Sequence, residues 1–261
     1  MHELLDYAAT VARRAGTEIL KYYHLSSTVN LKHDGSPLTI ADQKSHALIS
    51  DLLAQTGIDI VSEEGGDLKL DSYRYWLVDP LDGTKDFLAK NDQFTVNIAL
   101  IEANRPVLGV VFAPASNEMY AGGISLGATY TNTRETAVCA PLPANATCRM
   151  TVSRFHAPPD NATFAQHNAI ASEVAVGSAL KYGYLATGQA DVYPRLIGSS
   201  EWDTAAGQAV LEAVGGAVLD WHRKEPLRYG KARRRNPRLI AFRAPYTIDQ
   251  FTLQDYPEKL L

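Results

Sequence analysis

The amino-acid sequence predicts a mixed α and β protein built of two units, an α+β unit over residues 1–143 and an α/β unit over residues 144–261. In the first unit, two helical patterns precede several apolar strand patterns, an order typical of helices layered on a sheet. In the second unit, strand and helix patterns alternate, which is typical of an α/β arrangement. Between them, over residues 141–147, the composition changes to Pro, Ala, Asn and Thr, and this change marks the boundary.

The first unit begins with an amphipathic helix. Its apolar side chains recur at helical spacing: Leu4, Ala8, Val11, Ala15 and Ile19. A second helix is expected from about Ile40 to Ala54. Strands are then expected in IDIVSEE, which ends in acids, and in RYWLVDP, whose unbroken apolar run predicts burial on both faces. FTVNIALI and PVLGVVFAP, joined by the short polar stretch EANR, predict a hairpin.

The second unit is expected to begin with the strand RMTVS. A helix over GSALKYGYLATG, closed by Gly188, and the strand ADVYP follow. WDTAAGQAVLEAVGG predicts a helix rich in small residues that stops at Gly215 and Gly216, and AVLDW predicts a further strand.

Composition limits the classes of function. The net charge of −4 gives no global sign of a nucleic-acid partner. Cys139 and Cys148 are too few for a disulfide framework, so a reduced, intracellular setting is expected. The N-terminus lacks a signal-peptide pattern, and there is no run of about eighteen apolar residues that could span a bilayer. These features predict a cytoplasmic protein.

Acidic residues stand at the ends of several predicted elements: Asp42, Glu63, Glu64, Asp79, Asp82 and Asp203. Each has an ordinary structural explanation when taken singly. Asp82 before Gly83 is typical of a turn, Asp203 of a helix cap, and Asp42 of a capping box. Paired glutamates after a strand are typical of a solvated edge.

Taken together, the same acids favour a metal site. Asp79 ends a strand whose apolar run predicts a central place in the sheet, and binding sites in layered sheets gather where strands end. Carboxylate oxygens are the ligands that Mg²⁺ prefers, and Gly83 with Thr84 can turn backbone N–H groups towards a phosphate. Two carboxylates 4 Å apart repel by roughly 4 kcal/mol at an effective dielectric of about 20. The cluster therefore predicts bound cations or raised carboxyl pKa values.

The spacing of Asp79 and Asp82 distinguishes between phosphatase chemistries. Phosphatases of the haloacid-dehalogenase type use two Asp separated by one residue, the first as a covalent nucleophile. Here two residues, Pro80 and Leu81, lie between them. This spacing favours a metal-held water over an aspartyl-phosphate.

The segments EE, DPLDGTKDF and WDTAAGQAVLEAVGG together resemble the signature of the inositol monophosphatase superfamily of Mg²⁺-dependent, Li⁺-sensitive phosphatases. SPLTIAD, FTVNIALI, LGVVFAP and GSALKYGYLATGQADVYPR are similar to its 3'(2'),5'-bisphosphate nucleotidases of the CysQ type. The resemblance runs from about residue 3 to about residue 240. It implies a layered α-β-α-β-α sandwich. KARRRNPR and the tail beyond Pro245 depart from it.

The resemblance implies two or three Mg²⁺ ions. The implied ligands are Glu63, Asp79 and the Leu81 carbonyl for one ion, and Asp79, Asp82 and Asp203 for a second. Asp42, through water beside Glu63, would help to place a third, weaker ion. Of the glutamate pair, the family assigns the ligand to the first, so Glu64 is the weaker candidate.

The resemblance also implies how the substrate binds. Gly83 and Thr84 would cradle the reacting phosphate at a site lined by Leu81, Asp82 and Asp203, and Thr84 with Glu63 would orient the attacking water. The nucleotide end is implied at four positions: His156, Ser178, Lys181 and Arg195. Each also has an ordinary reading, such as a loop histidine or a lysine that extends to solvent.

The implied reaction is hydrolysis of the 3'-phosphate of adenosine 3',5'-bisphosphate to AMP by metal-activated water, as in nucleotide recycling and sulfur metabolism. The 3'-phosphosulfate analogue is a second expected substrate. The alternative is an inositol or sugar monophosphatase of the same superfamily. Relatives include monomers and homodimers, and both states stay open here.

The basic run KARRRNPR is by default a solvated face. A distant alternative is a non-catalytic nucleic-acid binder that uses this run, but it has no interleaved aromatic residues, so no nucleic-acid partner is expected. Peripheral contact with the cytoplasmic face of the inner membrane, through anionic lipid, is a further alternative.

Overall fold

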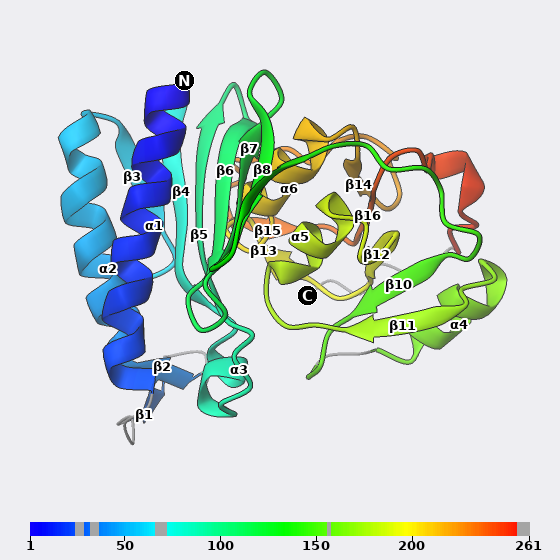
Figure 1. Cartoon of the computed structure of the whole chain (residues 1–261), viewed down its shortest axis with the longest axis horizontal. Helices are drawn as coiled ribbons and strands as arrows, with labels where there is room; N and C mark the ends of the chain where they lie inside the picture. Colours follow the sequence, from blue (N-terminus) through cyan, green and yellow to red (C-terminus); the bar gives the residue numbers. More distant parts are fainter. Residues whose placement is uncertain (24–28, 32–36, 66–71, 156–157, 255–261) are drawn as a thin grey trace.

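In a computed structural model, the described part of the chain, residues 1–23, 29–31, 37–65, 72–155 and 158–254, is stacked in five layers (Figure 1). Helices α1 (His2–Tyr23) and α2 (Ile40–Leu53) form the first layer, which covers one face of a large sheet. Helices α5 (Leu180–Ala186) and α6 (Ala205–Ala213) lie between this sheet and a smaller one. Helix α4 (Asp160–His167) covers the outer face of the smaller sheet.

The described residues place seven strands in the large sheet, in chain order. They are β3 (Asp59–Ser62), β4 (Arg74–Asp82), β5 (Thr95–Glu102), β6 (Arg105–Ala113), β7 (Glu118–Gly123), β8 (Gly127–Thr131) and β9 (Thr136–Cys139). Strands β3 and β4 are parallel, and the later neighbours are antiparallel. The carboxyl ends of β3 and β4 therefore lie side by side.

Strand β4 is apolar along its length because both of its faces are buried. Trp76 and Val78 pack with the residues of α1 and α2. Tyr75 and Leu77, which alternate with them, pack with the residues of α5 and α6. Successive side chains of a strand point to opposite faces of the sheet, so the apolar run of β4 contributes to two hydrophobic cores.

Helix α6 lies against the large sheet at unusually short range. A Cβ atom at Gly109 of β6 would lie 2.4 Å from the carbonyl oxygen of Ala206. Only glycine at this position permits the approach, and it fixes where the first turn of α6 lies relative to the sheet.

The smaller sheet is mixed. Its strands lie in the order β11 (Ser172–Ala175), β10 (Arg149–Val152), β12 (Val192–Arg195), β16 (Leu239–Phe242) and β14 (Ala217–Asp220). Strand β10 is parallel to β11 and β12, whereas β16 is antiparallel to β12 and β14. On its outer face Phe164 of α4 contacts Trp221, with ring centroids 5.8 Å apart.

Short elements complete the described chain. They are β1 (Val29–Leu31) paired with β2 (Pro37–Thr39), the 3-10 helices at Ala54–Thr56 and Ile248–Gln250, α3 (Thr84–Leu88), and β13 (Ser199–Ser200) paired with β15 (Arg235–Asn236).

The layered α-β-α-β-α arrangement expected from the sequence is confirmed, as is the hairpin of β5 and β6. The sequence analysis did not predict the helices α3 and α4 or the strands β1, β2, β7, β8, β9, β11, β13, β15 and β16. Helices α5 and α6, from the second predicted unit, pack directly on the large sheet. The division into units of 1–143 and 144–261 stays a prediction.

Candidate active site

Asp79 and Asp82 lie on the same face of the large sheet because β4 carries a bulge between them. Asp82 lies three positions after Asp79 on β4, whereas their partners Asn97 and Thr95 on β5 lie two positions apart. Residues three apart on a regular strand point to opposite faces, and one extra residue restores a common face. Both carboxylates therefore point towards the layer of α5 and α6.

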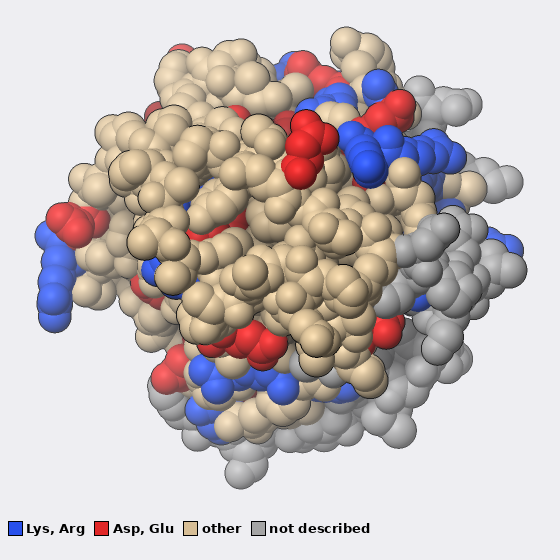
Figure 2. Space-filling view, turned by 90° about the vertical axis from the view of Figure 1, so that its right-hand side faces the viewer, with Lys and Arg blue, Asp and Glu red and all other residues tan. Residues whose placement is uncertain are grey.

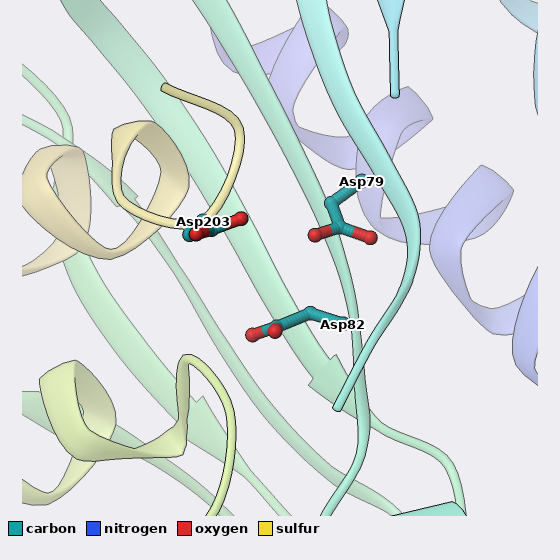
Figure 3. Close-up of side chains that lie close together, drawn as sticks. All are labelled: Asp79, Asp82 and Asp203. Carbon is teal, nitrogen blue, oxygen red and sulfur yellow. The ribbon is translucent and has the colours of Figure 1, made fainter. Parts of the chain in front are cut away.

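The third carboxylate comes from the loop before α6. Asp203 lies just before Thr204, the N-cap residue of that helix. One carboxylate oxygen from each of Asp79, Asp82 and Asp203 lies within 4.8 Å of the others. Figure 3 shows the three side chains converging from β4 and from the α6 side.

Hydrogen bonds hold each carboxylate in place. The backbone N–H of Leu81 donates to Asp79 Oδ1 at 3.1 Å, and Asn97 Nδ2 donates to Asp82 Oδ2 at 3.4 Å. The N–H of Ser200 donates to Asp203 Oδ2 at 2.8 Å. The cluster is thus fixed from three separate segments.

The carboxylates destabilise one another as anions. Burial, followed by the charges of Glu63, Asp82 and Asp203, raises the pKa of Asp79 well above its ordinary value. Burial and the charge of Asp203 raise the pKa of Asp82 to about 6. Burial, opposed by the Ser200 N–H and supported by the charge of Glu63, raises the pKa of Asp203 to about 6.

This donor set fits a divalent metal ion. Three carboxylates within reach of one ion are hard oxygen ligands of the kind that Mg²⁺ prefers. A cation among them would offset the repulsion that raises their pKa values.

The other predicted acids lie around this cluster. Glu63 follows β3, where its N–H donates to the Val78 carbonyl at 3.1 Å, and its side chain lines the site cavity. Asp42, on α2, is 1% exposed, and its charge contributes to the raised pKa of Asp79. Glu64 is half-buried and does not line the cavity.

The segment after Asp82 turns sharply into α3. Gly83 has a φ of 87°, in the left-handed region that favours glycine, and is the N-cap residue of α3. Thr84 Oγ1 donates to the Leu81 carbonyl at 3.5 Å. Gly83 and Thr84 both line the cavity beside Asp82.

The cavity has a volume of about 240 Å³ and is lined from both predicted units. Two cations, Lys181 and Arg195, and Ser178 line the same cavity. Lys181, at the start of α5, is 3% exposed and donates to the Ser178 carbonyl at 2.9 Å. Burial, followed by the charge of Arg195, lowers the pKa of Lys181 to about 8, against the opposing charge of Asp82.

Two polar groups of these cavity residues are available to bind a ligand. Ser178 Oγ and Arg195 Nε are buried and have no hydrogen-bond partner in the described part of the chain. Ser178 has a φ of 46°, a strained backbone value for serine that is typical of functional sites. Arg195 is held by Nη1 donating to Tyr193 Oη and Nη2 donating to the Gly198 carbonyl, each at 3.3 Å.

The sequence analysis missed several residues that line the cavity. Tyr193 lies below Lys181, with Nζ 5.5 Å from the ring centroid, and Phe155 lies at 47% exposure on another wall. Tyr193 is two residues before Arg195 on β12, so the period of two was the available signal. His156 lies outside the described residues.

The default reading of KARRRNPR as a solvated face is wrong for part of the run. Arg233 is exposed, but Lys231 and Arg234 form ion pairs with the buried Glu201. Figure 2 shows the face around the smaller sheet, where Lys and Arg gather in small groups beside acids among mostly uncharged residues. Within the described chain, no helix combines the length and apolar character needed to cross a membrane.

Comparison with known proteins agrees with this geometry. A model described as the inositol monophosphatase family matches residues 1–250. The chain is 40% identical over 243 residues to the 3'(2'),5'-bisphosphate nucleotidase CysQ of Escherichia coli K12, covering 87% of this chain and 94% of that protein.

Solved structures show the same architecture. The crystal structure of CysQ from Bacteroides thetaiotaomicron, described as a bacterial member of the inositol monophosphatase family, has a TM-score of 0.82 at 34% identity. That match covers 92% of this chain and 97% of the other. An IMPase from Thermotoga maritima gives a TM-score of 0.76 at 25% identity, over 93% and 92% of the two chains.

Proposed function

The chain belongs to the inositol monophosphatase family, and from this premise we propose that it hydrolyses the 3'-phosphate of adenosine 3',5'-bisphosphate to give AMP and phosphate. It is a phosphatase of the bisphosphate nucleotidase type, as its CysQ relatives are named. The 3'-phosphosulfate analogue is the second substrate that we propose.

One observation carries this proposal: a single cavity is lined by both acidic and cationic side chains. The cluster of Asp79, Asp82 and Asp203, two of which line the cavity, suits a metal ion and the phosphate that reacts. The two cations that line the same cavity, Lys181 and Arg195, suit a second anionic group on the substrate. A nucleoside bisphosphate carries both groups.

We propose that Mg²⁺, at two or three positions, is the metal. Its protein ligands would be Glu63, Asp79, Asp82, Asp203 and the Leu81 carbonyl, with Asp42 contributing through water. When bound, such a cation neutralises phosphate charge and lowers the pKa of a water molecule. The chain's own contribution is to gather these oxygens before the substrate arrives.

Glu63 and Thr84 would orient the attacking water towards phosphorus. Both side chains line the cavity beside Asp82, and Thr84 Oγ1 is directed by its hydrogen bond to the Leu81 carbonyl. Phosphoryl transfer depends mainly on positioning and charge neutralisation. Side-chain oxygens of Glu63 and Thr84 would therefore suffice to orient the water.

Lys181, Arg195 and Ser178 would bind the 5'-phosphate. The unpartnered Ser178 Oγ and Arg195 Nε supply a donor each, and Lys181 supplies a buried charge. His156 stays a candidate for the same end of the substrate.

The test is phosphate release from a small panel of esters: adenosine 3',5'-bisphosphate, its phosphosulfate analogue, adenosine 3'-monophosphate and inositol 1-phosphate. We expect the bisphosphate to give the highest kcat/KM with Mg²⁺, and EDTA or Li⁺ to suppress release. A preference for inositol 1-phosphate would instead support the alternative, an inositol or sugar monophosphatase. Equal release with and without EDTA would contradict the metal site.

A cytoplasmic location, contact with the inner membrane and the monomer or homodimer state stay predictions from the sequence.

A further inference from the structure

Part of the basic run 231–238 packs behind the loop that carries Asp203. Strand β13 of that loop pairs antiparallel with β15 of the run, Ser199 opposite Asn236 and Ser200 opposite Arg235. The sequence analysis gave this run no role in the reaction. Its contacts place it next to a predicted metal ligand.

Asn236 is the central residue of this contact and is 6% exposed. Its Nδ2 lies 3.2 Å from Ser199 Oγ, 2.8 Å from the Ser200 carbonyl and 2.8 Å from Thr204 Oγ1. Ser200 and Thr204 flank Asp203 on either side, so one amide ties both ends of its loop. Ser200 is also the residue whose N–H donates to Asp203 Oδ2 at 2.8 Å.

A buried charge fixes the run against the same loop. Glu201 is 0% exposed and accepts from the N–H groups of Gly230 and Lys231 at 3.1 and 3.0 Å. Its carboxylate pairs with Lys231 Nζ at 2.7 Å and with Arg234 Nη1 at 3.4 Å. Lys231 Nζ also donates to Asn236 Oδ1 at 3.2 Å, which sets the orientation of the amide.

The far side of the loop is tied into α6. Thr204 Oγ1 lies 3.2 Å from Tyr229 Oη, which donates to Gln208 Oε1 at 2.6 Å. Thr204 is therefore held from two directions, by Asn236 and through Tyr229 by the helix. Asp203 has little freedom to move while these bonds stand.

Asn236 does not line the cavity, so it has no contact with a substrate there. Any effect it has on the reaction must pass through the loop 199–204.

We propose that Asn236 is a positioning residue for Asp203, which holds the loop 199–204 so that this carboxylate meets Asp79 and Asp82. The inference rests on the proposed function, because it requires Asp203 to be a metal ligand. Removing the amide should weaken metal binding before any substrate is present. Outer residues that orient metal ligands typically change metal affinity by about 10- to 100-fold.

The experiment measures Mn²⁺ binding to the full-length, metal-free protein by electron paramagnetic resonance, without substrate. We compare wild type, Asn236→Ala and the matched control Arg233→Ala, which removes an exposed cation from the same run. We expect Asn236→Ala to weaken Mn²⁺ binding about tenfold or more, and Arg233→Ala to change it less than twofold. Circular dichroism and thermal unfolding show whether each variant is folded.

If Asn236→Ala is not recovered folded, Asn236→Ser, which keeps one donor, replaces it with the same expected direction. A folded Asn236 variant with wild-type Mn²⁺ affinity, even at a lower Tm, overturns this inference but leaves the proposed function intact. Wild-type protein that binds no Mn²⁺ overturns the metal site and the inference together. A tenfold loss that Arg233→Ala shares would overturn the inference, because it would show that any change in the basic run weakens Mn²⁺ binding, whether or not the Asn236 amide is present.

Discussion

Asp82 shares a face of the sheet with Asp79 only because one extra residue lies between them in β4. Its carboxylate is held by Asn97 at 3.4 Å and meets Asp203 from the opposite layer. We therefore expect the site to depend on the charge of Asp82 rather than on its shape.

Asp82→Asn should lower kcat/KM roughly 100-fold or more, because the amide keeps the shape but loses the charge that binds a cation. Phosphate release from adenosine 3',5'-bisphosphate at high Mg²⁺ measures the change. Asp51→Asn, an exposed acid on α2, is the matched control and should be unaffected. Turnover like that of wild type in Asp82→Asn would contradict the assignment.

Lys181 predicts an alkaline limit to activity. Burial first, and then Arg195, lower its pKa to about 8, so the ammonium is present below that pH and is lost above it. We expect kcat/KM for adenosine 3',5'-bisphosphate to fall above about pH 8. Adenosine 3'-monophosphate, which lacks the second phosphate, should show no such fall.

Lys181→Met should lower kcat/KM for the bisphosphate by about tenfold or more, since hydrogen bonds to charged groups contribute about 1.5–3 kcal/mol. The variant should also lose the alkaline fall seen in wild type. An unchanged pH profile in Lys181→Met would show that another group titrates.

The turn between β4 and α3 depends on Gly83. Its φ of 87° costs a residue with a side chain about 1–2 kcal/mol, and a Cβ there would lie 3.2 Å from the Gln93 carbonyl oxygen and from Ser178 Cβ. Gly83→Ala should lower both Tm and activity, because Thr84 must shift. Gly57→Ala has a similar φ of 67° with open space around it, so it should lower Tm alone. Equal activity of the two variants would refute this role for the turn.

Elements with strong periodicity could be predicted from the sequence, and the details that orient the site could not. The helix over 2–23 and the buried strand over 74–82 follow from apolar spacing. The bulge in β4 could not be predicted, because it is defined by the register with β5. Regular alternation would have placed Asp79 and Asp82 on opposite faces.

The basic run shows a second limit of prediction. Lys231 and Arg234 look like surface charges in the sequence, and their partner Glu201 lies about thirty positions earlier. Because Glu201 pairs with cations that are distant in the sequence, no local sequence pattern predicts its burial. The acids themselves were singled out by their positions at the ends of predicted elements, and the resemblance to a known family, which the comparisons confirm, implied their individual roles.

At the scale of the whole molecule, stability should depend on pH and on metal together. The folded-state pKa of Asp82 and Asp203 is about 6, above the ordinary 3.8, so the folded chain holds these protons more tightly than the unfolded chain. Their stabilising contribution is complete below about pH 3.8 and is lost as pH rises through about 6.

The difference in Tm between Mg²⁺ and EDTA should therefore grow as pH rises from about 5 to about 7. The effect on Tm of groups that titrate elsewhere in the chain is the same in both buffers and cancels in the difference. Thermal unfolding with Mg²⁺ and with EDTA measures this difference. A difference that stays constant over this range would show that the three carboxylates do not bind the ion.

The cavity combines acids from the first predicted unit with cations from the second. Neither unit holds a complete site, since Asp203 lies on the far side of the boundary from Asp79 and Asp82. The two sheets and the helices between them must pack before the reaction can occur.

The residues of the site are synthesised in an order that delays its completion during translation. A growing chain exposes Asp79 and Asp82 early, but Asp203 emerges more than a hundred residues later and its anchor Asn236 later still. Amino-terminal segments fold first during synthesis, so the large sheet can form around an incomplete cluster. We expect nascent chains to have no phosphatase activity until β15, which contains Asn236, has been translated.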